Sequence, residues 1–148
     1  MVHKKIGCAI IGYGGMGNWH ANKITHEMGE FAELIGVYDI NPNRNQVARE
    51  KGYHFFLDEG ELLADENVQL VIIATPNDVH KEIAIRALEA GKNVISEKPV
   101  AMNSNELEEM ISCANRCNKL FTVHQNRRWD QDYLSVRKLM EENSLGKI

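Results

Sequence analysis

Gly12-Tyr13-Gly14-Gly15-Met16-Gly17 has the pattern G-x-G-x-x-G. Alone this pattern is weakly specific, but here it follows the apolar run Cys8 to Ile11 and precedes a segment with helical spacing. In that setting Gly12 permits a tight turn, Gly14 lets the backbone approach a diphosphate, and Gly17 lets the helix pack closely on the strand. The pattern predicts a dinucleotide-binding turn, with a purely structural glycine-rich turn as the alternative.

The segment after this turn has the spacing of a helix that buries one face. Gly17, Ala21, Ile24 and Met28 recur at i, i+4, i+7 and i+11. We therefore expect a helix from about Gly15 to Met28 with Gly17 on its buried face. Its N-terminus would direct free N–H groups at the phosphates.

Short apolar runs alternate with longer amphipathic segments along the rest of the chain. Nearly continuous apolar strands joined by helices are typical of a parallel sheet that is covered on both faces. We predict one α/β domain over residues 1–148 with a doubly wound parallel sheet, the Rossmann fold. About six strands are expected, at residues 5–11, 33–38, 53–56 (the weakest), 68–74, 93–96 and 120–124.

Several residues have the pattern of helix ends. Asn41-Pro42 would start one helix, and Asn77 or Asp78 would cap another that stops at Gly91. Asn103 and Glu106 have the spacing of a capping box.

Composition excludes several classes of protein. The net charge is −4, so the chain lacks the basic surplus that nucleic-acid binding requires. No apolar run approaches the roughly 20 residues of a membrane span, and the N-terminus lacks the features of a signal peptide. Three cysteines without a signal peptide indicate a reducing, cytoplasmic setting. No metal site is expected, because Cys113 and Cys117 lack further ligands nearby.

Asp39 ends the second predicted strand, 22 positions after Gly17. An acidic residue there suits hydrogen bonds to the hydroxyls of an adenosine ribose. Its charge would repel a 2′-phosphate, so NAD is favoured over NADP, although Arg44 lies close enough to soften that preference. The alternative is a solvated aspartate at the end of a strand.

Three polar clusters end the later strands: Thr75-Pro76-Asn77, Glu97-Lys98-Pro99 and His124 to Arg128. Parallel strands deliver their C-terminal ends to one edge, so these clusters should face the crevice at the glycine-rich turn. The alternative is that short loops place them there without function.

Lys98 is the strongest candidate for chemistry. A lysine near a carbinol or carbonyl oxygen can polarise it and assist proton transfer during hydride movement. Pro99 restricts Lys98 to extended backbone geometry. His80 either lines the same pocket or is an ordinary helix histidine.

Together these elements resemble the glucose–fructose oxidoreductase / inositol dehydrogenase / rhizopine catabolism (Gfo/Idh/MocA) family over nearly the whole chain. The resemblance is carried by the glycine-rich turn, Asp39, Ala74-Thr-Pro-Asn77 with His80, Glu-Ala-Gly91-Lys-Asn-Val and, most specifically, Glu97-Lys98-Pro99.

The resemblance implies roles for these residues. Lys98 matches the family's lysine beside the reacting oxygen and the nicotinamide, and Pro99 matches a proline that is often cis. Thr75, Pro76 and Glu97 match positions near the ribose and nicotinamide of the cofactor. In the same way, Asn126 and Arg127 match a segment near the nicotinamide and substrate.

The family also implies a larger protein that oxidises or reduces sugars, inositols and related polyols with NAD(P). Its members continue into a second domain that carries an Asp and a His of the active site and usually forms the oligomer interface. Residues 145–148 resemble the entry to that domain. We therefore expect a domain that binds cofactor but is inactive alone, exposes an apolar patch near its last helix, and could self-associate.

A stand-alone, non-catalytic NAD(H)-binding or redox-sensing module is the alternative, and a flavin or methyl-donor domain fits Asp39 and Lys98 poorly.

Overall fold

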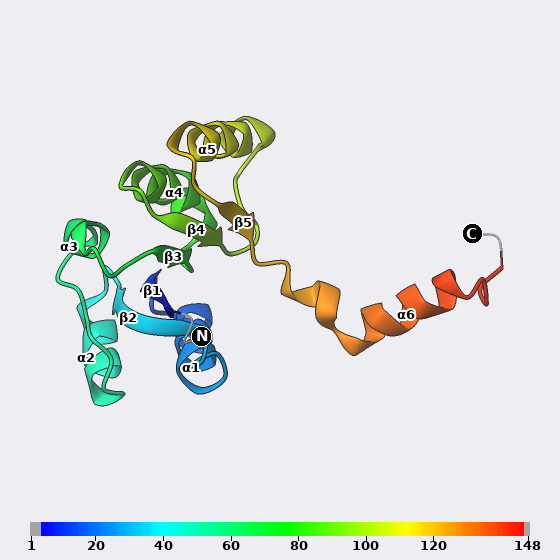
Figure 1. Ribbon diagram of the computed structural model, residues 1–148, viewed down its shortest axis with the longest axis horizontal. Coiled ribbons are helices and arrows are strands. Elements are labelled where there is room, and N and C mark those ends of the chain that lie inside the picture. Colours follow the sequence, from blue (N-terminus) through cyan, green and yellow to red (C-terminus); the bar gives the residue numbers. More distant parts are fainter. Residues whose placement is uncertain (1–3, 147–148) are drawn as a thin grey trace.

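The computed structural model describes residues 4–146 and is built around a parallel five-stranded sheet (Figure 1). Residues 1–3 and 147–148, which include part of the expected entry to a second domain, lie outside the described residues. The strand order is β2-β1-β3-β4-β5. The strands are β1 (Ile6–Ile11), β2 (Ala32–Tyr38), β3 (Leu70–Ile73), β4 (Asn93–Ser96) and β5 (Phe121–Val123). All neighbouring pairs are parallel, so the predicted α/β fold is confirmed.

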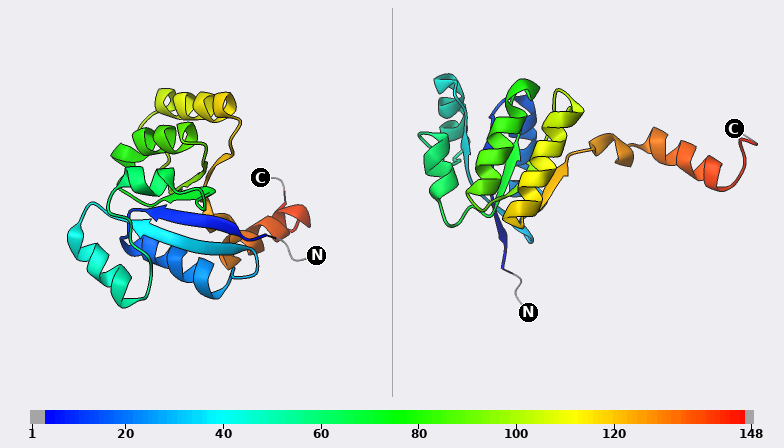
Figure 2. Two further views of the ribbon diagram at one scale, coloured as in Figure 1. Left: turned by 60° about the vertical axis from the view of Figure 1, so that its left-hand side comes forward. Right: turned by 90° about the horizontal axis from the view of Figure 1, so that it is seen from above.

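Helices cover both faces of the sheet. In the left view of Figure 2, α1 lies on one side of β1 and β2, and α4 and α5 lie on the other. The helices are α1 (Gly15–His26), α2 (Pro42–Glu50), α3 (Glu59–Ala64), α4 (His80–Glu89), α5 (Ser104–Cys117) and α6 (Gln131–Glu141). Short 3₁₀ turns at Asn77–Val79 and Asn126–Trp129 precede α4 and α6.

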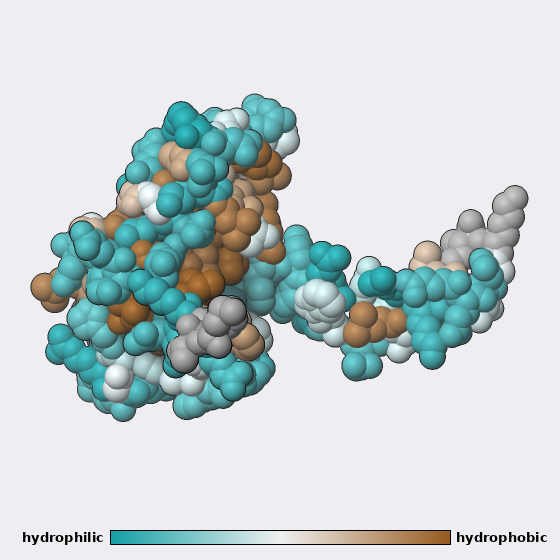
Figure 3. Space-filling view, viewed as in Figure 1, coloured by the Kyte–Doolittle hydropathy of each residue, from teal (hydrophilic) through white to brown (hydrophobic). Residues whose placement is uncertain are grey.

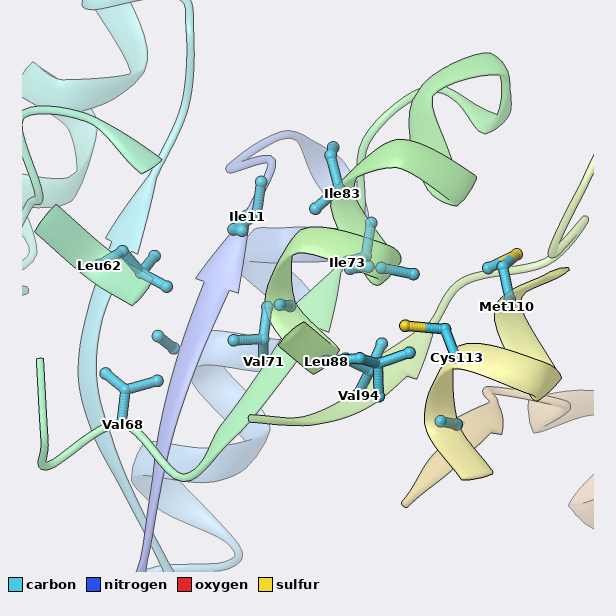
Figure 4. Packing of buried hydrophobic residues seen from close by; sticks show 14 of the residues in the cluster. Ile11, Leu62, Val68, Val71, Ile73, Ile83, Leu88, Val94, Met110 and Cys113 are labelled. Atoms are coloured by element: carbon cyan, nitrogen blue, oxygen red, sulfur yellow. The ribbon is translucent and has the colours of Figure 1, made fainter. Parts of the chain in front are cut away.

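The side chains of β1 alternate between two hydrophobic clusters. Cys8 and Ile10 pack with residues of α1 and α2, whereas Ala9 and Ile11 pack with residues of α3, α4 and α5. Figure 4 shows the second cluster, in which Ile11 lies near the Ile83 side chain of α4. Because both faces are buried, an almost continuous apolar strand is stable in the middle of the sheet. Cys8, the first residue of the apolar run before the glycine-rich turn, belongs to this core.

The prediction of six strands is wrong by one. The segment expected at residues 53–56 makes only an isolated parallel bridge, Phe55 to Val37 of β2. Asp58 then caps α3 by accepting a hydrogen bond from the Glu61 N–H at 2.8 Å. The chain therefore turns into a helix after one bridged residue, which leaves no length for a ladder.

Most of the predicted helix ends are confirmed. The Asn41 and Asn103 side chains accept hydrogen bonds from the N–H groups of Asn43 and Glu106, both at 3.0 Å. Gly91 follows α4 with φ of +80°. The expected cap at Asn77 or Asp78 is wrong, because the 3₁₀ turn comes first and no side chain caps α4.

The start of α1 packs against the turn that precedes it. A Cβ atom on Gly17 would lie 2.0 Å from the carbonyl oxygen of Gly12, and Gly12 itself has φ of +92°. Both positions therefore require glycine. Gly17, Ala21 and Ile24 are buried as predicted, whereas Met28 lies beyond the helix and is exposed.

Helix α6 projects from the body of the domain as an arm (Figures 1 and 2). Trp129, Tyr133, Val136 and Met140 are exposed at this arm, where an apolar patch was expected. In the view of Figure 3 a small hydrophobic area lies among hydrophilic residues there. Between residues 4 and 146, no helix combines the length and apolar character that crossing a lipid bilayer would require.

The contact between Gly12 and Gly17 predicts a stability effect. Gly17→Ala should lower the free energy of unfolding by about 3 kcal/mol, because the added methyl group meets backbone atoms that cannot move aside easily. Gly29→Ala is the control, since its Cβ would make only an ordinary contact of 3.7 Å with the Thr25 oxygen. Urea denaturation of both variants measures the difference. Equal stability of the two variants would contradict the packing described for α1.

Candidate functional site

A cleft of about 860 Å³ opens where β1, β2 and β3 end. It lies at the point where the strand order reverses, because β2 pairs with one side of β1 and β3 with the other. Ligands of open α/β sheets bind at such a switch point. Five of the predicted site residues line this cleft: Gly12, Gly14, Asp39, Thr75 and Pro76.

The floor of the cleft is backbone from the glycine-rich turn. Gly14 precedes α1 with φ of −82° and no side chain caps the helix. A Cβ on Gly14 or on Gly15 would meet nothing within 4 Å, so the space in front of these glycines is open. The first N–H groups of a helix have no partner within the helix. The structure therefore has room and donors for a diphosphate at this position.

Asp39 joins the end of β2 to the glycine-rich turn. Its Oδ2 accepts the backbone N–H of Tyr13 at 2.7 Å, and its Oδ1 accepts that of Asn41 at 2.8 Å. A carboxylate has about four lone-pair positions, so it retains capacity for ribose hydroxyls. The Tyr13 ring points away from the cleft: it is buried and packs edge-on against Tyr53.

His80 links two of the strand-end loops rather than lining the cleft. It is buried, with Nε2 3.0 Å from the Thr75 carbonyl oxygen and Nδ1 3.0 Å from that of Pro99. The peptide bond between Lys98 and Pro99 is cis. The contacts of His80 with both carbonyl oxygens place the Thr75 and Lys98 loops side by side at the edge of the sheet.

Glu97 is the centre of a buried hydrogen-bond network that the sequence did not reveal. Its Oε1 lies 2.8 Å from His20 Nε2 and 2.8 Å from His124 Nδ1. Its Oε2 accepts the backbone N–H of Lys98 at 3.3 Å. The three side chains come from α1, the end of β4 and the end of β5. They also form a cluster of metal-ligand type that the cysteine spacing could not have predicted.

Burial and hydrogen bonding act on the pKa values of this network. Burial would raise the pKa of Glu97, but the hydrogen bonds from His20 and His124 outweigh it and hold that pKa below its ordinary value. Burial lowers the pKa of His20, and its hydrogen bond to Glu97 offsets only part of this effect. Glu97 is therefore a carboxylate and His20 a neutral imidazole near pH 7.

The other predicted residues lie outside the cleft. Lys98 is exposed directly beyond β4, and Asn77 donates to the Met102 sulfur at 3.1 Å. Asn126 lines a separate hollow beside β5, and its Oδ1 is buried without a hydrogen-bond partner within residues 4–146. Arg127 is exposed and pairs with Asp130 at 2.8 Å, so the structure does not bring it to the cleft. Met16 is half-buried in the first turn of α1.

One wall of the cleft consists of residues that were not predicted from the sequence. Val79, Glu82, Ile83 and Arg86 line it from the start of α4 and the turn before it. Their spacing of i, i+3, i+4 and i+7 is a helix face and could have identified this wall. Arg44, considered only as a neighbour of Asp39 in sequence, also lines the cleft.

Three features together define a dinucleotide-binding α/β domain. They are the uncapped helix start behind a glycine-rich turn, the acidic residue at the end of the adjacent strand, and the cleft at the switch point. Residues 6–125 match the sequence model of the GFO_IDH_MocA family, described as "Oxidoreductase family, NAD-binding Rossmann fold". The chain belongs to this family.

Individual relatives agree with this assignment. The chain is 39% identical over 144 residues to the scyllo-inositol 2-dehydrogenase (NADP(+)) IolW of Bacillus subtilis, covering 94% of this chain and 38% of that protein. An NAD-binding protein from Listeria innocua has a similar structure, with a TM-score of 0.93, 46% identity and coverage of 97% of this chain and 42% of that one. The WlbA dehydrogenase from Bordetella pertussis, solved with NADH and UDP-GlcNAcA, matches with a TM-score of 0.89, 29% identity and coverage of 98% and 44%. The chain thus spans less than half the length of these relatives.

The lowered pKa values predict acid sensitivity. Unfolded His20 takes up a proton below about pH 6.5 and unfolded Glu97 below about pH 4.3, whereas in the folded chain both resist protonation to lower pH. The free energy of unfolding should therefore fall as pH decreases through this window. His20→Gln should flatten the decline between about pH 6.5 and 5, while His26→Gln, at an exposed position, should not. Urea denaturation as a function of pH measures how steeply the free energy of unfolding falls. Equal slopes for the unaltered chain and the two variants would contradict this account.

Proposed function

We propose that this chain binds NAD, and NADP less tightly, across the cleft at the ends of β1, β2 and β3. The diphosphate lies against the start of α1, and the adenosine ribose is held by Asp39. The observation that carries this proposal is the open backbone at Gly14, with the Asp39 carboxylate fixed at the edge of the same turn. Thr75 and Lys98, at the ends of β3 and β4, would then face the nicotinamide.

The whole protein would use this domain for hydride transfer between the cofactor and a sugar, an inositol or a related polyol. Bound NAD supplies the hydride acceptor. Lys98 Nζ donates a hydrogen bond to the reacting oxygen of the substrate and stabilises the charge that develops there. The name of IolW supports a polyol as the class of substrate, and the UDP-GlcNAcA in the WlbA structure supports a sugar derivative.

The remaining catalytic groups and the oligomer interface would lie in a second domain, so this chain alone would bind cofactor without turnover. The length that it shares with its relatives supports this division. The exposed apolar side chains along α6, among them Val136 and Met140, would then contact that domain or a second copy.

Gly14→Ala tests the diphosphate site. The added methyl group meets no protein atom within 4 Å, so the stability of the fold should change little. It would occupy the space of the diphosphate, and the affinity for NAD should fall by about tenfold or more, equivalent to about 1.4 kcal/mol. Isothermal titration calorimetry measures the affinity and urea denaturation the stability. Unchanged NAD affinity would contradict the position proposed for the diphosphate.

Asp39→Ala tests the ribose contact. The variant loses hydrogen bonds to the ribose and the charge that repels a 2′-phosphate, so NAD should bind more weakly and the preference for NAD over NADP should shrink. Asp39→Asn is the matched variant: it keeps the side-chain shape and one carbonyl oxygen for the Tyr13 N–H, but it removes the charge and the acceptor of the Asn41 N–H. Parallel titrations with both dinucleotides give the ratio of affinities. A ratio that neither variant changes would show that the ribose contact is misassigned.

A further inference from the structure

Glu97 is an unusual residue to bury directly before the proposed catalytic lysine. It is 5% exposed, yet it is a carboxylate whose removal from water is costly unless hydrogen bonds compensate. Three N–H groups supply that compensation: those of His20, His124 and the Lys98 backbone. An apolar side chain would fill this space at lower cost, so the contacts of Glu97 with Lys98 call for a specific explanation.

The two imidazoles hold Glu97 through different ring nitrogens. Because the carboxylate has no proton to give, His20 donates from Nε2 and His124 from Nδ1, and one oxygen of Glu97 accepts both hydrogen bonds. The Trp19 ring lies 5.1 Å from the ring of His20 and 5.5 Å from that of His124, measured between centroids. The backbone N–H of His124 also donates to the Ser96 carbonyl at 2.9 Å.

The far side of Lys98 is held as well. After Lys98, the Pro99 carbonyl oxygen lies 3.0 Å from His80 Nδ1. Before Lys98, the backbone N–H of Glu97 donates to the Ile73 carbonyl of β3 at 2.9 Å. The three residues Glu97, Lys98 and Pro99 are therefore anchored before and after the lysine, while the Lys98 side chain itself is exposed. A short segment fixed at both ends fixes the direction in which its middle side chain leaves the backbone.

We propose that His20 and His124 are positioning residues, which clamp the Glu97 carboxylate and so aim Lys98 at the nicotinamide end of the bound cofactor. This inference rests on the proposed function, because Lys98 is given its role there. In this assignment His20 and His124 act through their hydrogen bonds to Glu97.

A metal ion is the competing explanation, since two imidazoles and a carboxylate are ligands that Zn²⁺ accepts. The contacts favour hydrogen bonds. Both 2.8 Å distances are those of charge-assisted N–H···O bonds, and the Glu97 oxygen serves both rings at once. Both oxygens of Glu97 and the ring nitrogens that face them have hydrogen-bond partners without an ion.

The difference in ring nitrogens gives a test with matched variants. The amide nitrogen of glutamine can replace Nε2 of histidine, and that of asparagine can replace Nδ1. His20→Gln and His124→Asn should therefore keep the clamp, whereas His20→Asn and His124→Gln should lose it. A purely space-filling role would not produce this crossed pattern.

The first readout isolates the contribution of the nicotinamide to the binding affinity. Calorimetry of the whole 148-residue chain measures the affinities for NAD and for ADP-ribose, which lacks the nicotinamide. His20→Asn and His124→Gln should change the ratio of NAD affinity to ADP-ribose affinity by about fivefold, with ADP-ribose affinity unchanged, because the Lys98 ammonium lies beside the nicotinamide. Lys98→Met should have the same effect, and combining it with His20→Asn should add nothing, because both act through one group.

The second readout needs no ligand. The Lys98 amide hydrogen, which donates to Glu97, should exchange with solvent faster in His20→Asn and His124→Gln and at the original rate in His20→Gln and His124→Asn. Nuclear magnetic resonance measures this exchange residue by residue, and the stability of each variant is measured in parallel.

The outcomes separate the two proposals. If the chain binds neither ADP-ribose nor NAD, the proposed function fails, and this inference fails with it. If ADP-ribose binds but the crossed pattern is absent from both the affinity ratio and the Lys98 exchange, the positioning role alone is overturned. Stoichiometric Zn²⁺ binding that all four histidine variants abolish would also overturn it, in favour of a metal site.

Discussion

The hydrogen bond from the Tyr13 N–H to the Asp39 carboxylate, 2.7 Å long, joins the glycine-rich turn to the end of the neighbouring strand. Two other parts of the site depend on this contact. It fixes the turn whose open backbone faces the cleft at Gly14, and it holds the acidic side chain beside that opening. The close approach of Gly17 to the Gly12 carbonyl then sets the position of the helix start relative to both. One small contact thus couples the two ends of the proposed ADP-binding site.

A second set of contacts organises the loops beside the cleft, beyond the ends of β3, β4 and β5. Three histidines contact the strand-end loops: the His80 ring lies between the Thr75 and Pro99 carbonyl oxygens, and His20 and His124 donate hydrogen bonds to Glu97. Side chains that reach between loops compensate for the small number of backbone hydrogen bonds available beyond the ends of strands. Lys98 is therefore exposed on a segment whose neighbours are fixed.

The sequence predicted local features well and tertiary contacts poorly. Glycine spacing, apolar runs and the Asn41 and Asn103 caps identified the fold because each depends on residues near in sequence. The segment at 53–56 failed because the cap of α3 at Asp58 ends its pairing, and Asn77 failed as a cap because a 3₁₀ turn intervenes. The clamp on Glu97 joins residues 77 and 27 positions apart, and no local pattern encodes such a contact.

The most direct test of the account is a nuclear magnetic resonance titration of the chain with NAD. We predict that the backbone amide signals of Gly14, Gly15 and Met16, together with those beside Asp39, shift in proportion to bound NAD, and that signals along α6 do not. Saturable binding that shifts amides elsewhere and leaves the glycine-rich turn unchanged would contradict the central claim.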